Sequence, residues 1–220
     1  MAKKTPESTH SSAFKKLQKK TAGCRICPAL ADQPAILSPA NGNLNAKIVF
    51  VAEAPGRMGA GRTGVPFQGD KSGDNFEILL KHIGLTRADV FITNAALCNP
   101  LEDGKNRKPK TSEIKNCSPF LKETLDLIKP NVVVTLGSVG LQALNLILGT
   151  RYQLKNEVAK QIPTDTFTLF PLYHPSPRVT NWMRPLSQQK KDFKKIPGRT
   201  RSASKGKYLK GTPSQDGYCE

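Results

Sequence analysis

The chain has 220 residues, which is enough for one substantial domain with a buried core. Its 34 Lys and Arg residues outnumber 17 Asp and Glu residues, and the net charge of +17 favours a polyanionic partner. No stretch approaches the roughly 18 apolar residues that a membrane-spanning helix needs. The first 20 residues lack the apolar segment of a secretory signal, so we expect no membrane partner and a cytosolic or nuclear setting.

Predicted strands and helices alternate along the chain. Short apolar runs predict buried strands at 45–52, 89–97, 131–137 and 165–175. Helical spacing of apolar residues predicts helices at 74–85, 111–130 and 138–148. This alternation is typical of a three-layer α/β/α domain with a central, mainly parallel four-stranded sheet. In such sheets binding sites lie at the carboxyl ends of the strands.

Polar, basic segments flank the predicted domain. We expect a basic N-terminal arm at 1–20, a folded domain at 21–184 and a disordered, flexible basic tail at 185–220. Between Arg184 and Lys210 there are ten basic residues and one acidic residue, so +9 of the net charge lies there. We therefore expect the tail to add non-specific, salt-dependent affinity for nucleic acid.

Four cysteines are candidate metal ligands. Cys24 and Cys27 form a CxxC pair, Cys98 directly follows the second predicted strand, and Cys117 lies in the predicted helix after it. Four thiolates can bind Zn²⁺ or a [4Fe–4S] cluster. Zinc ribbons usually have two tight pairs, whereas 18 residues separate Cys98 from Cys117. The spacing leans towards a cluster and leaves open both zinc and a chance arrangement of structural cysteines.

A glycine-rich loop, "EAPGRMGAGRTGVPFQGD" (53–70), follows the first predicted strand. It contains no GxxxxGK[ST] pattern, and no acidic residue ends a second strand about 20 residues further on, so a nucleotide cradle is a weak interpretation. The glycines instead favour close approach to something flat. Phe67, between Pro66 and Gly69, is placed to stack on a base, although taken alone it would be interpreted as a core residue.

Six segments in the same order resemble the iron–sulfur branches, families 4 and 5, of the uracil-DNA glycosylase superfamily. They span about residues 22–180 and read "GCRICPAL", "VFVAEAPGRMGAGRTGVPFQGDKSGD", "FITNAALCNPLEDGKNRKP", "EIKNCSPFL", "PNVVVTLG" and "YHPSPR". The resemblance implies a DNA repair enzyme that flips uracil, and other deaminated bases, out of DNA. It would then hydrolyse the glycosidic bond without a covalent lysine intermediate and leave an abasic site. The resemblance also implies a structural [4Fe–4S] cluster on Cys24, Cys27, Cys98 and Cys117, with zinc as the alternative.

The same resemblance implies a set of base-binding residues, namely Glu53, Ala54, Gly56, Phe67 and Asn94. Phe67 would stack on the flipped base. The amide of Asn94 offers a donor and an acceptor, which suits the O4 and N3–H edge of uracil and not the edge of cytosine.

Three catalytic residues are implied. His174 matches a histidine near O2 of the base, where it can stabilise negative charge on the departing uracil. Family 4 has an acidic residue where this chain has Gly59, whereas the family 5 pattern maps the acidic residue to Asp70. Asp70 would position water and stabilise an oxocarbenium-like sugar. Asn106 matches a family 5 asparagine near the same place.

The "HPSPR" segment implies contacts to DNA through Ser176, Pro177 and Arg178. We thus expect a monomer that acts on uracil-containing DNA, single or double stranded, in the cytoplasm and nucleoid of a prokaryote, with a nuclear location as the alternative. Two other functions stay open: a hypoxanthine- or xanthine-directed DNA glycosylase, and a non-catalytic iron–sulfur module that binds nucleic acid.

Overall fold

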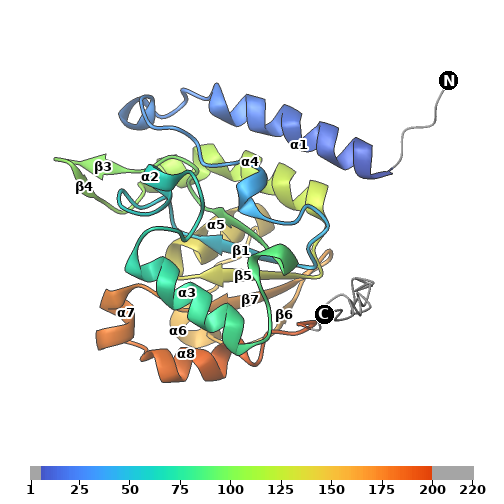
Figure 1. Ribbon diagram of the computed structural model, residues 1–220, viewed down its shortest axis with the longest axis vertical. Coiled ribbons are helices and arrows are strands. Elements are labelled where there is room, and N and C mark those ends of the chain that lie inside the picture. The colour runs from blue at the N-terminus through green and yellow to red at the C-terminus, as the bar shows by residue number, and fades with distance from the viewer. Residues whose placement is uncertain (1–5, 200–220) are drawn as a thin grey trace, which may run out of the picture.

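A parallel sheet forms the centre of the computed structural model, which describes residues 6–199 (Figure 1). Its strands are β1 (Ile48–Ala52), β2 (Phe91–Asn94), β5 (Val132–Leu136), β6 (Ile162–Pro163) and β7 (Thr168–Leu172), in the order β2-β1-β5-β7-β6. β1, β2, β5 and β7 are parallel neighbours, whereas β6 pairs antiparallel with β7. The mainly parallel sheet is confirmed, but it has five strands rather than the predicted four, because the two-residue β6 is too short to give a strand pattern.

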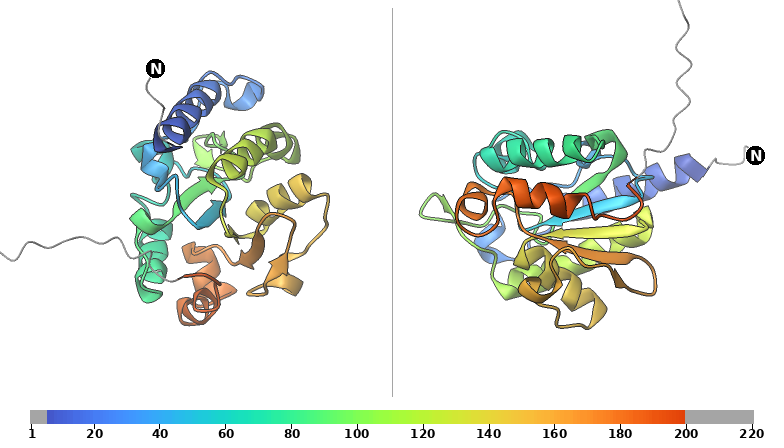
Figure 2. Two further views of the ribbon diagram at one scale, coloured as in Figure 1. Left: turned by 90° about the vertical axis from the view of Figure 1, so that its right-hand side faces the viewer. Right: turned by 90° about the horizontal axis from the view of Figure 1, so that it is seen from below.

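Helices cover both faces of the sheet. α3 (Lys71–His82) and α8 (Leu186–Phe193) lie on one side, and α5 (Ser138–Leu148) lies on the other, as the right-hand view of Figure 2 shows. α4 (Thr111–Ile128) packs beside α5, and α1 (Pro6–Ala22) packs on α4. This arrangement confirms the three-layer α/β/α architecture.

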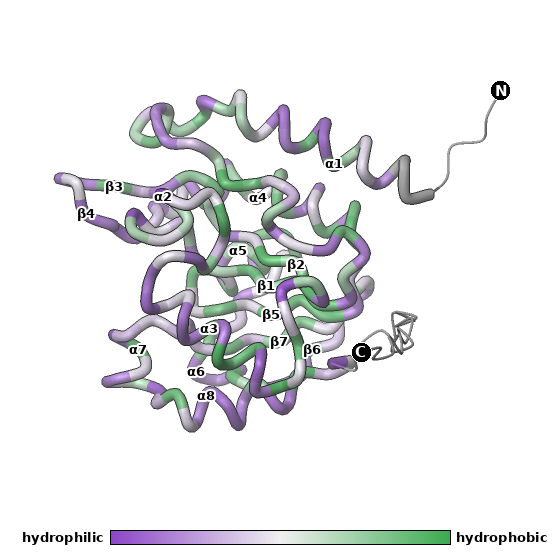
Figure 3. The backbone as a smooth tube through the Cα atoms, in the orientation of Figure 1, coloured by the Kyte–Doolittle hydropathy of each residue, from purple (hydrophilic) through white to green (hydrophobic). Residues whose placement is uncertain are grey.

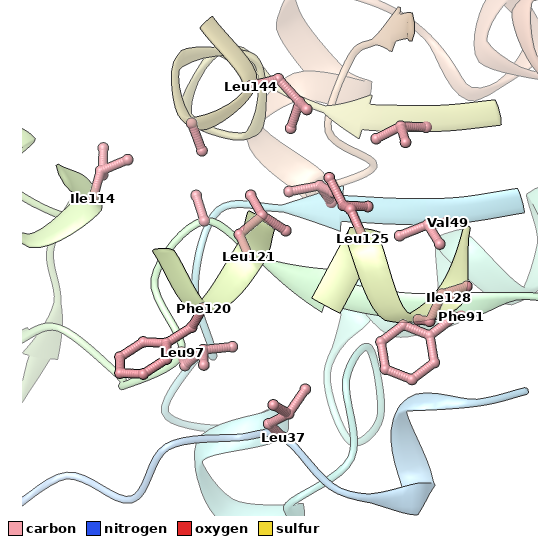
Figure 4. Close-up of a cluster of buried hydrophobic side chains, with 14 of the residues drawn as sticks. Leu37, Val49, Phe91, Leu97, Ile114, Phe120, Leu121, Leu125, Ile128 and Leu144 are labelled. Carbon is pink, nitrogen blue, oxygen red and sulfur yellow. The ribbon is translucent and has the colours of Figure 1, made fainter. Parts of the chain in front are cut away.

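The central strand β1 is apolar throughout because both of its faces are buried. In β1, Ile48, Phe50 and Ala52 join the core under α3 and α8, whereas Val49 and Val51 join the core under α4 and α5. Figure 4 shows part of the second core, where side chains from α4 and α5 meet those of the sheet. The two-residue alternation therefore sorts one strand between two separate cores.

The predicted N-terminal arm is, in its described part, a docked helix. Phe14 and Leu17 of α1 are buried. The ring of Phe14 packs edge-to-face on Phe91 of β2, with the ring centroids 5.9 Å apart. The ammonium group of Lys20 lies 2.8 Å from a carboxylate oxygen of Glu123 on α4. The basic residues of α1 form its outer face, and two apolar residues one turn apart attach the helix.

The predicted domain boundary at 184 is wrong. Helix α8 follows it, and Phe193 and Ile196 are buried under the sheet. The ring of Phe193 stacks on Phe50 of β1 at 6.1 Å. In Figure 3 the tube of α8 has mostly the hydrophilic colour, and this composition explains why the sequence suggested a tail. The rest of the predicted tail, 200–220, lies outside the described residues.

Smaller elements complete the fold. They are the short helices α2 (Ala60–Thr63), α6 (Leu154–Glu157) and α7 (Pro177–Trp182) and a hairpin of β3 (Leu101–Glu102) and β4 (Lys105–Asn106). Within 6–199, no helix has the length and apolar character needed to cross a bilayer.

The buried position of Phe193 gives a test of the corrected boundary. We expect Phe193→Ala to lower the free energy of unfolding by about 3–5 kcal/mol, because the substitution leaves a cavity between α8 and the sheet. Urea denaturation followed by circular dichroism measures this change. The control Ser187→Ala, at an exposed position of the same helix, should stay within about 0.5 kcal/mol of the parent. Equal stability of the two variants would contradict the docking of α8.

Candidate active site

The loops that follow β1, β2 and β7 surround a cavity of about 440 Å³. The β3–β4 hairpin and α7 project from the same side of the molecule, on the left in Figure 1. The residues at the cavity wall that the sequence singled out are Glu53, Ala54, Gly56, Phe67, Asp70, Asn94, Asn106, His174, Ser176 and Arg178. Pro177 begins α7 between the last two. The structure thus brings the predicted site residues together, apart from the four cysteines.

Asp70 connects the glycine-rich loop to helix α3. It is the N-cap of the helix, and its Oδ1 accepts a hydrogen bond from the backbone N–H of Gly73 at 2.9 Å. Its Oδ2 points towards the glycine-rich loop. A Cβ on Gly59 would clash with this oxygen, and one on Gly56 would lie 3.3 Å from it. A side chain at 59 would therefore require the carboxylate of Asp70 to shift from this position.

Asn106 reaches the same loop from the β3–β4 hairpin. Its Oδ1 accepts a hydrogen bond from the backbone N–H of Arg57 at 2.8 Å. Its Nδ2 would be 3.6 Å from a Cβ on Gly56, on the side that also faces Asp70. Asp70 and Asn106 thus approach the loop around one glycine, Gly56.

Phe67 has both a buried and an open side. Its ring stacks on Phe76 of α3 at 4.5 Å, and it lies 5.5 Å from the ring of His174 across the cavity wall. Its φ of 52° is in the left-handed region, where a bulky residue is strained. A Cβ on Gly73 would clash with the carbonyl oxygen of Phe67, so position 73 in the first turn of α3 requires glycine.

Arg87 holds this strained segment, and the sequence analysis missed it. Its guanidinium donates to the carbonyl oxygens of Pro66 at 2.7 Å and Phe67 at 2.6 Å, and it also pairs with Glu77 on α3. Three acceptors on one planar cation fix the loop relative to the helix. No motif signals such a residue, because it acts on backbone oxygens that any sequence supplies.

His174 follows β7 and is neutral at physiological pH. Part of its ring is open to the cavity, but desolvation by the surrounding protein lowers the pKa of His174 to about 4, while the charge of Asp70 acts in the opposite direction. Its loop is fixed from α3, because the side-chain amide of buried Asn75 donates to the carbonyl oxygen of Pro175 at 2.8 Å. Gly137 lets the β5–α5 turn approach, since a Cβ there would lie 3.3 Å from that of His174.

Glu53 and Asn94 lie at the carboxyl ends of the neighbouring strands β1 and β2. Asn94 is the last residue of β2 and is 4% exposed. Burial raises the pKa of the Glu53 carboxyl group, and nearby Lys108 opposes that rise. Asn99, also buried, supports the loop between them when its amide nitrogen faces the carbonyl oxygen of Pro55 at 2.8 Å.

The four cysteines of the predicted metal site line a second, smaller cavity. All four are free thiols. The backbone N–H of Leu97 donates to Sγ of Cys117 at 3.3 Å, and the amide of Asn116 donates to Sγ of Cys27 at 3.4 Å. In residues 6–199, no group of three or more His, Cys, Asp or Glu side chains has the arrangement of a metal site.

The surroundings of the cysteines nevertheless suit a bound cation. Burial, followed by the charges of neighbouring sulfurs, raises the pKa of Cys98 to about 11. Burial also raises the pKa of Cys117 to about 12, against the effect of the Leu97 N–H. The charges of neighbouring sulfurs raise these pKa values further, so ionisation of all four cysteines would require a cation among them. Thiolates are the ligands that iron–sulfur clusters and zinc take.

A buried ion pair joins the two cavities. Arg107 lines the larger cavity and Glu113 lines the cysteine cavity. Two guanidinium nitrogens of Arg107 donate to the two carboxylate oxygens of Glu113 at 2.8 and 2.6 Å. The hydrogen bond from Arg107 lowers the pKa of Glu113, so the pair is ionised at neutral pH.

Comparison with known proteins identifies this arrangement. The family model of the uracil DNA glycosylase superfamily matches residues 39–196, and the chain belongs to that superfamily. The type-4 uracil-DNA glycosylase of Sulfurisphaera tokodaii is 31% identical over 191 residues, covering 84% of this chain and 83% of the relative. The type-4 enzyme of Archaeoglobus fulgidus is 33% identical, covering 79% and 86%.

A relative of the other branch matches comparably. The type-5 uracil-DNA glycosylase of Pyrobaculum aerophilum is 32% identical over 187 residues, covering 72% of this chain and 80% of the relative. The resemblance to families 4 and 5 is therefore confirmed, and both branches match this chain. The match to 196 also includes α8, in agreement with the corrected domain boundary.

The low pKa of His174 can be measured. We expect its ring to titrate with a midpoint of about 4 rather than at the ordinary value of 6.5, because burial disfavours the charged form. Proton–nitrogen NMR of histidine-labelled protein would follow the three histidines, and His174→Gln would assign the signal. A midpoint near 6.5 would contradict this environment.

The low pKa of His174 also makes the stability of the folded protein depend on pH. The unfolded chain binds a proton at His174 below about pH 6.5, whereas the folded chain does so only near pH 4. The stability from this neutral histidine is complete above the unfolded value and decreases as the pH falls from 6.5 towards 4. His174→Gln should remove this part of the acid sensitivity.

Proposed function

We propose that the protein is a monofunctional uracil-DNA glycosylase. It extrudes a uracil nucleotide from DNA, hydrolyses the bond between the base and the sugar, and leaves an abasic site. The observation that carries this proposal is the meeting of Phe67, Asp70, Asn94, Asn106 and His174 around one cavity at the carboxyl edge of the sheet. The names of the type-4 and type-5 relatives support it.

Recognition of the base follows from the cavity wall. The open face of Phe67 provides a stacking surface, and its other face is fixed on Phe76. The buried amide of Asn94 can donate to O4 of uracil and accept from N3–H. Cytosine presents a donor and an acceptor in the opposite positions, so a fixed amide discriminates against it. Glu53, Ala54 and Gly56 form the loop beside this face.

Two residues assist the chemical step, His174 at the departing base and Asp70 at the attacking water. A neutral His174 donates an N–H to O2 of the departing base, where negative charge develops as the bond from C1′ to N1 breaks. The cap uses Oδ1 of Asp70, so Oδ2 is available as a base. Oδ2 accepts a proton from the attacking water while the oxygen of that water bonds to C1′. The base leaves as an anion that solvent protonates. Asn106 helps to orient the water beside Asp70.

Contacts to the DNA backbone are proposed for the segment that follows His174. Ser176 and Arg178 line the mouth of the cavity, and Pro177 begins α7 between them. A hydroxyl and a guanidinium suit phosphate oxygens. A single chain supplies every residue of the proposed mechanism, so we propose that a monomer acts on single- or double-stranded DNA.

We also propose that Cys24, Cys27, Cys98 and Cys117 hold a [4Fe–4S] cluster. When bound, the cluster would act as a structural cross-link and would supply no step of the hydrolysis. The cysteines connect the end of α1 to the loop after β2 and to α4. The N–H donors to Cys27 and Cys117 are of the kind that stabilise cluster-bound thiolates.

A uracil-containing oligonucleotide tests the function. We expect wild-type protein to produce abasic sites that alkali converts to strand breaks on a gel. Asp70→Asn should lower the single-turnover rate by about 10²- to 10⁴-fold, since a general base is lost, while asparagine still caps α3. The control Asp74→Asn removes an exposed carboxylate from the same helix and should retain the parental rate.

The same gel separates the alternatives. Full activity of Asp70→Asn would move the water-activating role to another residue, with Glu53 the first to test. Absence of product from metal-loaded wild-type protein at any base would favour the non-catalytic module. An oligonucleotide with deoxyinosine belongs in the same assay, because a cavity of about 440 Å³ leaves room for a purine base.

The cofactor has an independent test. We expect freshly purified protein to show a broad visible absorption near 400 nm that oxidation bleaches, with about four irons per chain. Cys117→Ser should lose this absorption and the iron, whereas Ser118→Ala, one position along the same helix, should keep both. A colourless protein with one zinc per chain would show that the cysteines bind zinc and not a cluster.

A further inference from the structure

Trp182 is the most exposed large hydrophobic side chain that the structure describes. It is 85% exposed, and its neighbour Met183 is 63% exposed. Trp182 is also the only tryptophan in the chain. An indole ring left almost wholly in water is unusual, and an exposed aromatic beside a cavity marks a contact surface. The proposed function assigns no role to Trp182.

The ring lies at the rim of the proposed active site. Arg178, Val179 and Met183 line the cavity. Trp182 follows Arg178 by four residues and Val179 by three, so these three residues share one face of α7. Trp182 is therefore one helical turn beyond the cavity wall, on the side of the molecule from which the β3–β4 hairpin also projects (Figure 1).

The protein fixes the helix while leaving the indole free. Neither hydrophobic core includes Trp182. The chain after α7 is anchored, because Arg184 makes two hydrogen bonds of 2.7 Å to the buried carboxylate of Asp192 on α8. The guanidinium of Arg184 also lies 5.7 Å from the ring centroid of Tyr173. An exposed ring on a rigid support loses little conformational entropy on binding, which suits a binding contact.

We propose that Trp182 stacks on an unpaired nucleobase next to the extracted nucleotide, with Met183 extending the apolar surface. Extrusion of one nucleotide exposes the faces of its neighbours, and an aromatic side chain stacks on any base. The surrounding charge suits the phosphates of such a strand, since Arg57, Lys105 and Arg178 are all exposed at this end of the molecule. The inference deepens the proposed function and rests on it for the identity of the nucleic acid.

Because Trp182 is the single tryptophan of the chain, tryptophan fluorescence reports on this residue alone. The ligand is a single-stranded oligonucleotide with a tetrahydrofuran abasic analogue, which binds without turnover. We expect it to quench the emission of Trp182 and to protect the ring from iodide, while fluorescence anisotropy of a labelled copy confirms binding. Binding without quenching or protection would overturn the proposal.

Variants test the energetic part. Trp182→Ala should weaken binding of the same oligonucleotide by roughly 5- to 100-fold, the range expected for one base–aromatic stack. Trp182→Phe, which keeps a ring, should recover most of the affinity. Leu146→Ala truncates another exposed apolar side chain, on α5, and should bind as the parent does. Binding of Trp182→Ala within twofold of the parent would overturn the proposal.

A rate measurement separates stacking from a general disturbance of the site. At saturating enzyme, Trp182→Ala should excise uracil in a single turnover at close to the parental rate, because the ring lies outside the cavity. A loss that persists at saturation would contradict a role in binding alone. Excision by wild-type protein without quenching sinks only this inference, whereas quenching without excision sinks only the proposed activity.

Discussion

The site depends on the separate contacts that the two carboxylate oxygens of Asp70 make. One oxygen caps α3 through Gly73, and the other needs space that only Gly56 and Gly59 leave. The cap fixes the start of α3. The first two turns of this helix then position the other loops, because Gly73 lets the Phe67 carbonyl pass and the following turn carries the amide that holds the His174 loop. A change in this cap would therefore move the ring of Phe67 and the side chain of His174 together.

The four parallel strands could be predicted from the sequence because a fully buried parallel strand is a continuous apolar run. The same physics explains the errors. α8 has few apolar residues, and its buried Phe193 is one ring among basic neighbours, so composition indicated a tail. In the same way, α1 buries the apolar side chains of Phe14 and Leu17, while most of its other described side chains face water. Elements held by one or two side chains give a weak periodic signal, since most of their length faces water.

The candidate site could be predicted where its residues lie at or just after strand ends, because parallel strands bring their carboxyl ends to one edge. Asn94 ends β2, and His174 follows β7 by two residues. The supporting residues were not predicted. Arg87 and Asn75 act on backbone carbonyl oxygens of loops distant in the sequence. A backbone oxygen leaves no trace in the sequence, so only the fold could show these contacts. They determine the geometry of the site as much as the motif residues do.

The buried pair of Arg107 and Glu113 makes one unit of the two cavities. Arg107 adjoins Asn106 on the β3–β4 hairpin, and Glu113 caps the first turn of α4 by accepting from the backbone N–H of Lys110 at 2.8 Å. Cys117 lies one turn further along α4, beside the other cysteines. Removal of either charge would leave its partner buried and unpaired, which costs about 3–5 kcal/mol. The ion pair thus links the cysteine cavity to the hairpin that carries Asn106 through one rigid contact.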